Sequence, residues 1–486
     1  MAQRFSRAFN ENIGVNAAGR LQVEDIDAAD LAERFGTPLF VISESQIYEN
    51  VNRYRQAYVS RYRRSEILYA TKANNNPAVR RVFTLAGAGG DTFGPGELYL
   101  TLMAGTDPSR VVLNGFNKGD EEIRMAIEAG VTIHLDAVDE LDDVIRIAQE
   151  LGRSARIGMR SRLLLHGLDE VESEWPPGFF VGPGAREINK FGIDQAGMEY
   201  TCEQAMQSPH VEFVGFHHHV GRGAADVRLH QQVVKEQLEV AAGLRDQFGW
   251  VPEYFDFGGG MAWGRPEGHG PLGMDRGSPT IDEYAEVITT TFREGLATYS
   301  LGEPRLLVEP GRSLASDIGI LLSKVGIRKT FDDDVQQTWI GVDASENVLL
   351  NILSAAWYYH PVAAERVEAQ PTETVNLGDP LCWYGNLALS VELPHVERGD
   401  IIAFLDTGAY CESKALQFNA MPRPATVLVS GSSVEVITER EVLQDVTRRF
   451  RLPARLIPEP ASTVEKTQSR RIRPSSDDPE FRMKAI

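Results

Sequence analysis

Three residues able to support chemistry on an aldehyde cofactor each follow a short apolar run of this chain: Lys72, His219 and Glu309. Three consecutive glycines, residues 258–260, follow a fourth run. A desolvated lysine amine forms a Schiff base with an aldehyde, whereas a glycine turn exposes backbone N–H groups to a phosphate. A histidine ring can stack on an aromatic cofactor, and a carboxylate can keep a pyridine nitrogen protonated. Together these residues predict a pyridoxal phosphate site.

Each of these residues also has an ordinary structural explanation. A lysine at a strand end is more often a solvated charge, and three glycines often form only a tight turn. Glu309 is followed by Gly311 and Arg312, and a Glu–Arg pair on the surface contributes little stability. Histidines at positions 217–219 suggest a metal site, but neighbours in a strand point to opposite sides and no third ligand is evident. The sequence therefore predicts no metal.

Eight short apolar runs, each ending in a polar or glycine residue, predict the elements that position these groups. Amphipathic segments of helix length separate the runs, which is the pattern of a (β/α)8 barrel with its chemistry at the strand C-termini. After Arg312 the pattern changes to alternating strands, which indicates a second, all-β domain. We expect the barrel over residues 44–311, and a β-barrel or β-sandwich domain from residues 1–43 and 312–455. The eight runs, each with its terminal polar or glycine residue, lie at residues 67–72, 90–92, 112–114, 133–136, 157–160, 216–219, 257–260 and 307–309.

Four other segments have distinctive composition. Residues 164–190 and 263–280 are rich in Pro and Gly and predict long loops at the barrel mouth, suited to form a lid. Residues 439–451 predict a helix. The tail, residues 456–486, is rich in Pro, Ser, Arg and Asp, which predicts disorder.

Composition restricts the class of protein. The chain has 486 residues, of which 42% are hydrophobic and 24% charged, as in ordinary soluble globular proteins. A formal net charge of −20 argues against a nucleic-acid partner. The three cysteines, Cys202, Cys382 and Cys411, are too few for a disulfide framework and indicate a reducing compartment. No signal-peptide core or membrane-length apolar run is evident, so we expect a cytoplasmic enzyme.

Five motifs occur in one order along the chain. Their pattern resembles the fold-type III pyridoxal phosphate decarboxylases, the group that holds diaminopimelate, ornithine and arginine decarboxylases. The segments at residues 36–41 and 190–192 match the diaminopimelate branch best, and the similarity covers roughly residues 20–455. The motifs are Tyr-Ala-Thr-Lys-Ala-Asn at 69–74, His-His-His-Val-Gly at 217–221, Phe-Gly-Gly-Gly at 257–260, Glu-Pro-Gly-Arg at 309–312 and Gly-Ala-Tyr at 408–410.

This resemblance implies a role for each site residue. Lys72 would hold the cofactor as a Schiff base, with Asp91 and Arg160 in the network around its ring. His219 would stack on the ring and Glu309 would pair with the pyridinium nitrogen. The phosphate would be bound by Gly258, Gly259, Gly260, Gly311, Arg312 and the hydroxyl of Tyr410, with Arg222 in the place of a family serine.

The resemblance also implies a homodimer in which the partner chain completes each site. Cys382 would come from the partner and return a proton to Cα after carbon dioxide leaves. Its flanks, residues 378–381, match the Gly-Pro-x-Cys turn of the family. Cys411 begins a Cys-Glu-Ser triplet that also resembles the family, but it lies about thirty residues later. Both cysteines stay open, with Cys382 favoured.

Departures from the family pattern concern the substrate. Trp383 and Tyr384 stand where an acidic residue usually takes the distal ammonium of the substrate. Residues 346–359 contain no arginine to hold a distal carboxylate, and Phe418 resembles the ornithine type. Because a buried charge without a partner is costly, the usual substrates are doubtful. With Arg312, these aromatic residues predict a pocket for a larger or less charged side chain, although an aromatic cluster is also ordinary β-domain core.

The leading hypothesis is thus decarboxylation of a nonstandard α-amino acid, free or tethered to a carrier. One alternative keeps pyridoxal phosphate and changes the reaction to racemisation or other carbanion chemistry; Glu309 argues against it, since alanine racemases place an arginine near the ring nitrogen. A second alternative is a non-catalytic regulator similar to antizyme inhibitors. Such a protein has little reason to keep Lys72, His219, Glu309 and Tyr410.

Overall fold

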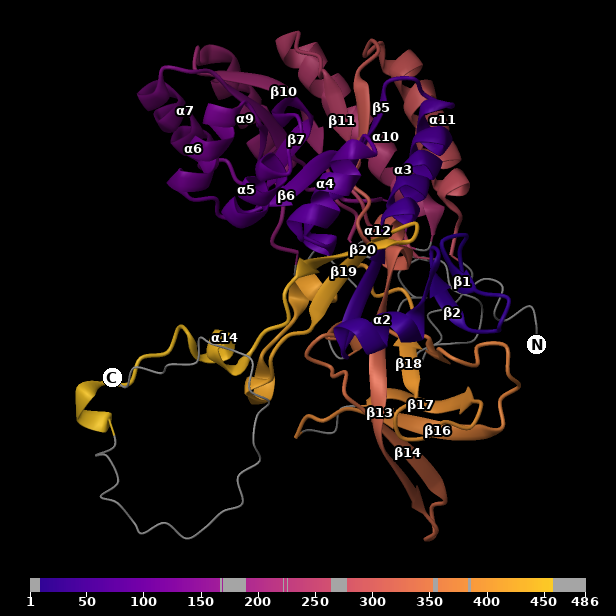
Figure 1. Cartoon of the computed structure of the whole chain (residues 1–486). Helices are drawn as coiled ribbons and strands as arrows, with labels where there is room; N and C mark the ends of the chain where they lie inside the picture. Colours follow the sequence, from indigo (N-terminus) through magenta and orange to yellow (C-terminus); the bar gives the residue numbers. More distant parts are fainter. Residues whose placement is uncertain are drawn as a thin grey trace.

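The computed structural model describes residues 9–166, 168, 189–221, 223–224, 226–263, 278–352, 357–382 and 386–457. A barrel surrounded by helices and a β-domain pack end to end, and the long strand β13 belongs to the β-domain (Figure 1). Several predictions fall outside the described residues: Arg222, Trp383, Tyr384, most of the two proposed lid loops and nearly all of the tail.

Eight parallel strands form a closed barrel, as the sequence predicts. Strand β12 pairs with β5, which closes the ring. All eight apolar runs of the sequence fall on or at the ends of these strands. One detail was wrong: β10 ends at His217, so His219 lies two residues beyond the strand rather than at its end. The strands are β5 (Ser65–Ala70), β6 (Gly89–Phe93), β7 (Val111–Asn114), β8 (Thr132–Leu135), β9 (Ala155–Arg160), β10 (Val211–His217), β11 (Tyr254–Asp256) and β12 (Arg305–Val308).

Helices follow the strands and cover the outside of the barrel. Their ends are set by local chemistry: Thr280 and Glu283 form a capping box at the start of α11, and Gly152 ends α7 in the left-handed conformation. Their apolar faces pack on the strands in one continuous core. They are α3 (Glu44–Val59), α4 (Pro77–Leu85), α5 (Pro95–Met103), α6 (Asp120–Ala129), α7 (Glu140–Leu151), α9 (Gln195–Gln207), α10 (Val227–Phe248) and α11 (Ile281–Tyr299).

The β-domain is built on a nine-stranded sheet with a main path of β17-β16-β14-β13-β4-β19-β20. Strand β4, just before the first barrel helix, pairs with both β13 and β19, so the N-terminal segment belongs to this sheet. A small sheet of β1 (Ile13–Val15), β2 (Leu21–Val23) and β3 (Ile26–Asp27) leads into α2 (Ala28–Phe35). The large sheet contains β4 (Leu39–Ser43), β13 (Gly319–Phe331), β14 (Gln337–Val342), β15 (Pro361–Ala363), β16 (Glu373–Gly378), β17 (Asn386–Leu393), β18 (Ile401–Phe404), β19 (Ala425–Ser430) and β20 (Ser433–Thr438).

The helix predicted over residues 439–451 was wrong in extent, since only α14 (Leu443–Thr447) is helical. Leu443 and Phe450 are 68% and 71% exposed, so this segment has little to pack against. It extends away from both bodies in Figure 1. Short helices depend on tertiary packing, which explains why this one stays so short.

Short helical turns link the two bodies at the barrel mouth. The turn that contains Lys72, η1 (Thr71–Ala73), receives a hydrogen bond from Tyr410 N to Ala73 O of 2.6 Å. Ser413 Oγ donates to Lys72 O at 3.1 Å. These bonds hold a β-domain loop against the C-terminal ends of the barrel strands. Elsewhere in the described chain the short helical turns are η2 (Pro108–Arg110), α12 (Arg312–Ala315), η4 (Ser316–Ile318), η5 (Glu412–Lys414), η6 (Phe418–Ala420) and η7 (Ala454–Leu456).

Across the part of the chain that the structure describes, no helix combines the length and apolar character required to cross a bilayer.

Candidate active site

Lys72 lies two residues beyond β5, and its ammonium meets a buried carboxylate. Lys72 Nζ is 2.5 Å from Asp91 Oδ2, on β6, and the lysine side chain is 35% exposed. Burial is the largest single influence and lowers the pKa of Lys72, but the hydrogen bond to Asp91 and the acidic groups around the amine together outweigh it, so the pKa lies above its ordinary value. The amine is therefore held in place as a cation, at the open end of the barrel.

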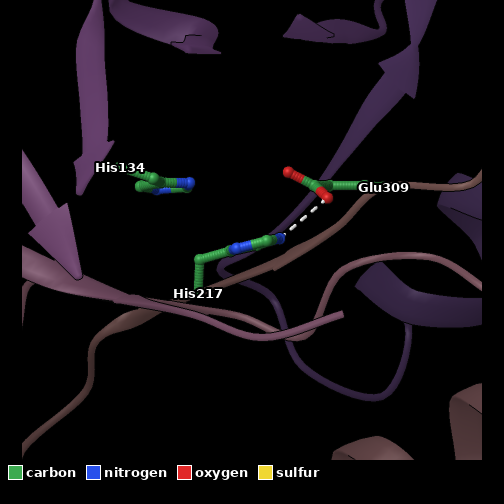
Figure 2. Close-up of side chains that lie close together, drawn as sticks. All are labelled: His134, His217 and Glu309. Carbon is green, nitrogen blue, oxygen red and sulfur yellow. Dashed lines mark hydrogen bonds and ion pairs between the residues drawn. The ribbon is translucent and has the colours of Figure 1, made fainter. Parts of the chain in front are cut away.

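Glu309 lies just beyond β12 and is almost fully buried. Asn114 Nδ2 donates to Glu309 Oε1 at 2.8 Å, and His217 Nε2 is 3.1 Å from Glu309 Oε2. Asn114 Nδ2 also donates to Asp91 Oδ1 at 2.8 Å. Figure 2 shows the carboxylate of Glu309 and the ring of His217 pointing toward each other. One amide group thus joins the carboxylate beside Lys72 to the carboxylate of Glu309.

His134 lies next to His217. Its Nδ1 is 2.8 Å from Asn114 Oδ1, and its Nε2 is 2.7 Å from the Tyr254 hydroxyl. The rings of His134 and His217 stack at 4.9 Å between centroids (Figure 2). Burial holds the pKa of both histidines well below the ordinary value, so both are neutral. Atoms of His134, His217 and Glu309 that could bind a metal lie within 4.8 Å of one another. Both ring nitrogens of His134 already have protein hydrogen-bond partners, so we interpret the group as a hydrogen-bonded cluster.

Asp256, at the end of β11, is completely buried near Glu309. Burial, followed by the negative charge of Glu309, raises the pKa of Asp256 well above its ordinary value. Its Oδ1 accepts a hydrogen bond from Gly258 N at 2.9 Å. Asp256 therefore shapes the glycine turn through this hydrogen bond.

Arg160, the last residue of β9, lies on the far wall. Its guanidinium is 3.3 Å from Asp136 and stacks 4.1 Å above the ring of Phe191. Asp136 also accepts from Gly192 N at 2.5 Å. These contacts tie residues 191–192, which match the diaminopimelate branch, to the barrel mouth.

The three glycines follow β11, and their backbone lies against neighbouring chain. A Cβ at Gly259 would collide with the carbonyl oxygen of Glu309, and one at Gly260 with that of Gly221. Gly258 and Gly260 have φ of 63° and 90°, which L side chains rarely adopt. His219 Nδ1 accepts from Gly259 N at 3.2 Å, which places the His219 ring beside the turn. Only glycines let this backbone approach both the strand ends and a ligand.

Replacement of Gly259 by alanine tests this packing. The new Cβ must displace the Glu309 backbone, so we expect destabilisation of about 1–3 kcal/mol and loss of phosphate binding. The matched control is Gly243→Ala on the exposed side of α10, where a Cβ meets no atom within 4 Å. That variant should gain about 0.5–1 kcal/mol from helix propensity. Thermal melts and titration with pyridoxal phosphate distinguish the two, and equal behaviour would contradict the assignment.

Arg312 lies next to Gly311 at the start of α12. Its guanidinium sits between the rings of Trp357 and Tyr410, at 4.1 and 4.7 Å from their centroids. Its buried Nη1 has no hydrogen-bond partner among the described residues. The Tyr410 hydroxyl faces Gly311, where a Cβ would lie only 2.9 Å from it. This corner therefore presents an unsatisfied cationic donor and a phenol.

The two candidate cysteines have different environments. Cys382 is exposed, and Asn419 holds it by a bond from Cys382 N of 3.2 Å and a contact to Sγ of 3.4 Å. The neighbouring Phe418 is 39% exposed. Cys411 is 1% exposed, and its Sγ is 3.1 Å from the Tyr359 hydroxyl in the β-domain core. Only Cys382 presents a thiol at the surface of this chain.

Sequence reasoning missed several residues of the site: Asn114, His134, the contact of His217 with Glu309, and Lys414. Lys414 Nζ donates to Asn351 Oδ1 at 3.1 Å, which brings a cation to the stretch that lacks arginine. Asn114 ends the third apolar run and His134 lies in the fourth, so the rule that polar residues at strand ends carry function would have found both.

Buried neutral histidines predict a pH effect on stability. Burial lowers the pKa of His218 and His230 to about 4, against about 6.5 in an unfolded chain. Between these values the unfolded state binds more protons, so these two groups reduce the unfolding free energy as pH falls from about 6.5 to 4. His218 Nδ1 bonds Ser161 O at 2.8 Å, and His218→Asn keeps a donor there. We expect this variant to show a smaller drop in melting temperature between pH 7 and pH 5 than the parent, and an equal drop would contradict it.

The residues present fit pyridoxal phosphate. The three glycines form a turn with no room for a Cβ, whose backbone N–H groups suit a phosphate, and Arg312 Nη1 is a buried donor in need of an acceptor. Each carboxylate oxygen can accept two hydrogen bonds, so Glu309 keeps acceptor capacity for a pyridinium N–H after its bonds to Asn114 and His217.

Comparison with known proteins agrees with this fit. Residues 44–316 match the family model "Pyridoxal-dependent decarboxylase, pyridoxal binding domain". The diaminopimelate decarboxylase of Methanothermobacter thermautotrophicus is 35% identical over 92% of this chain and 99% of its own length. That of Archaeoglobus fulgidus is 33% identical over 90% and 99%. The crystal structure of the M. jannaschii diaminopimelate decarboxylase with L-lysine superposes with a TM-score of 0.82, at 30% identity, over 92% of this chain and 99% of that one.

A closed eight-stranded barrel, a separate sheet domain and full-length similarity thus agree with the resemblance that the motifs indicate. This chain belongs to the fold-type III pyridoxal phosphate-dependent decarboxylases, close to the diaminopimelate decarboxylase branch.

Proposed function

We propose that this enzyme decarboxylates an α-amino acid whose distal end is recognised by residues other than those of ornithine and diaminopimelate decarboxylases. The observation that carries the proposal is the network that joins Lys72, Asp91, Asn114 and Glu309 at the barrel mouth. A lysine for covalent attachment and a buried carboxylate for the ring nitrogen lie beyond two neighbouring strands of the barrel, β5 and β12. This arrangement serves decarboxylation better than racemisation, since it favours a fully protonated ring.

Bound pyridoxal phosphate supplies an electron sink for the pair left on Cα when carbon dioxide departs. The protein provides attachment and orientation. Lys72 would hold the aldehyde carbon, and Glu309 would keep the ring nitrogen protonated. Asp91 and Arg160 would belong to the network around the ring, on which His219 would stack. Gly258, Gly259, Gly260, Gly311, Arg312 and Tyr410 would hold the phosphate, together with Arg222.

Cys382 is proposed to return the proton to Cα in the site of a partner subunit. Cys382 is exposed at the surface, and its hydrogen bonds with Asn419 fix its position, which supports a role across a homodimer interface. The bond of buried Cys411 to Tyr359 supports a structural role for the second cysteine. Trp383, Tyr384 and Phe418 are proposed to line the substrate pocket beside Cys382.

A second candidate substrate is diaminopimelate itself. The names of the relatives favour it, and so does the contact of Lys414 Nζ with Asn351, because an ammonium there can pair with a distal carboxylate. The absence of arginine from residues 346–359 favours the nonstandard substrate. Both candidates use the same cofactor chemistry and differ only in what the pocket selects.

A single set of assays tests these proposals. The purified protein should absorb near 420 nm (about the usual band for lysine-bound cofactor), and borohydride reduction should label Lys72. A screen for carbon dioxide release then compares diaminopimelate with ornithine, arginine and larger α-amino acids, free or carrier-bound. Exchange of the Cα hydrogen with the carboxyl group retained would instead support a racemase. A protein that stays colourless with added pyridoxal phosphate would support the non-catalytic regulator.

A further inference from the structure

One side-chain amide connects two carboxylates that come from distant parts of the chain. Asn114, at the end of β7, donates to Asp91 Oδ1 and to Glu309 Oε1, both at 2.8 Å. An amide nitrogen carries two N–H groups, so each carboxylate receives one of them. All three side chains are buried, where an unmet donor or acceptor is costly. The distance between the two carboxylates therefore depends on Asn114.

Chemistry dictates the orientation of this amide. The opposite orientation would turn Asn114 Oδ1 toward two carboxylates, where three acceptors would face one another. With Nδ2 toward the carboxylates, Oδ1 can only accept, so His134 Nδ1 must carry the proton of their 2.8 Å bond. His134 Nε2 then accepts from the Tyr254 hydroxyl at 2.7 Å. A chain of donors runs from Tyr254 through His134 and Asn114 to both carboxylates.

The groups around this chain keep its direction. Burial keeps the pKa of His134 well below its ordinary value and raises the pKa of Tyr254 well above its own. Tyr254 thus stays a donor and His134 stays neutral with one N–H. His217 bonds the second oxygen of Glu309, and burial raises the pKa of nearby Asp256 well above its ordinary value.

We propose that Asn114 and His134 are positioning residues that orient Glu309 toward the ring nitrogen of the cofactor and Asp91 toward Lys72. Asn114 and His134 thereby set the distance between the carboxylates of Asp91 and Glu309 before the cofactor binds. The inference rests on the proposed role of Glu309, and it goes further in assigning the control of that carboxylate to two residues that do not contact the cofactor.

The test reads the ring nitrogen directly, by the 15N chemical shift of 15N-labelled pyridoxal phosphate bound to the full-length protein. Asn114→Leu keeps the branched shape and the number of side-chain heavy atoms but removes all three hydrogen bonds. We expect its ring-nitrogen shift to move from the pyridinium value toward that of neutral pyridine, and its affinity for the cofactor to fall by about tenfold or more. A shift equal to that of the parent protein would overturn the proposal.

A second pair of variants keeps the test decisive if Asn114→Leu does not fold. His134→Phe removes the donor to Asn114, whereas His134→Asn retains an N–H at about the place of Nδ1. We expect the ring-nitrogen shift to change in the first and to stay near the parent value in the second. If the two variants gave the same shift, His134 would act through packing alone and the proposal would fail.

The matched control is Thr92→Val, on the strand that carries Asp91. Thr92 is buried, and its hydroxyl donates to Val112 O at 2.8 Å without contacting either carboxylate. This variant should lower the melting temperature and leave the 15N shift unchanged. The parent protein separates the two levels of inference: a neutral ring nitrogen there would refute the role of Glu309, whereas a protonated one that survives in both Asn114→Leu and His134→Phe would refute only the positioning role.

Discussion

Lys72→Ala is expected to lower decarboxylation by about 10⁴-fold or more, the scale of loss when a covalent catalytic group is removed. The variant should also lose the absorbance of lysine-bound cofactor and its labelling by borohydride. The reason is that no other amine is held by Asp91 at this strand end, where the Lys72 ammonium lies 2.5 Å from the carboxylate. Turnover assays and mass spectrometry of the reduced protein measure both effects.

Lys118→Ala is the matched control for this prediction. Lys118 also lies beyond a barrel strand and is buried, but its Nζ bonds Gly115 O and Glu140 in a structural contact. Its loss removes the cationic partner of the Glu140 carboxylate and leaves only bonds from backbone N–H groups, so the melting temperature should fall while cofactor labelling at Lys72 persists. Borohydride labelling of a lysine other than Lys72 in the parent protein would contradict the assignment of the Schiff-base residue.

Cys382→Ala is expected to lower kcat by about 10²- to 10⁴-fold, the usual contribution of a positioned general acid. Cofactor binding should be unchanged, because Cys382 is not among the residues that we expect to hold the cofactor. Cys411→Ala should instead lower the melting temperature, since it removes the 3.1 Å contact with Tyr359 from the β-domain core, and leave kcat within about tenfold. The reverse result would make Cys411 the proton donor.

Mixing the two inactive variants tests whether sites are shared. If Cys382 of one subunit serves the Lys72 of its partner, a heterodimer of Lys72→Ala with Cys382→Ala contains one site with both residues intact. Activity should then reappear when the two proteins are unfolded and refolded together. A mixture that stays inactive, although heterodimers form, would show that both residues act within one chain.

The sequence by itself was sufficient for the barrel and for much of the candidate site. Apolar runs that end in polar residues require buried parallel strands, and these strands must present Lys72, Asp91, Arg160 and Glu309 at one end of a closed barrel. The glycine triplet was readable because only glycine tolerates both the positive φ and the close backbone approach. The catalytic roles of these residues stay predictions until the variants above are measured.

Tertiary structure decided what depends on contacts between distant segments. Asn114 ends β7 and Glu309 follows β12, and their side chains are 2.8 Å apart because the pairing of β12 with β5 closes the strands into one ring. No local sequence pattern encodes that contact. The different environments of Cys382 and Cys411 arise from how the β-domain packs, since sequence periodicity does not distinguish a buried thiol from an exposed one. The prediction of a helix over residues 439–451 was wrong in extent for the same reason. Local propensity favoured a longer helix, but Leu443 and Phe450 are exposed, so packing does not stabilise helix beyond α14. Local preferences thus determined the strands and the groups at their ends, and long-range packing determined which of those groups touch.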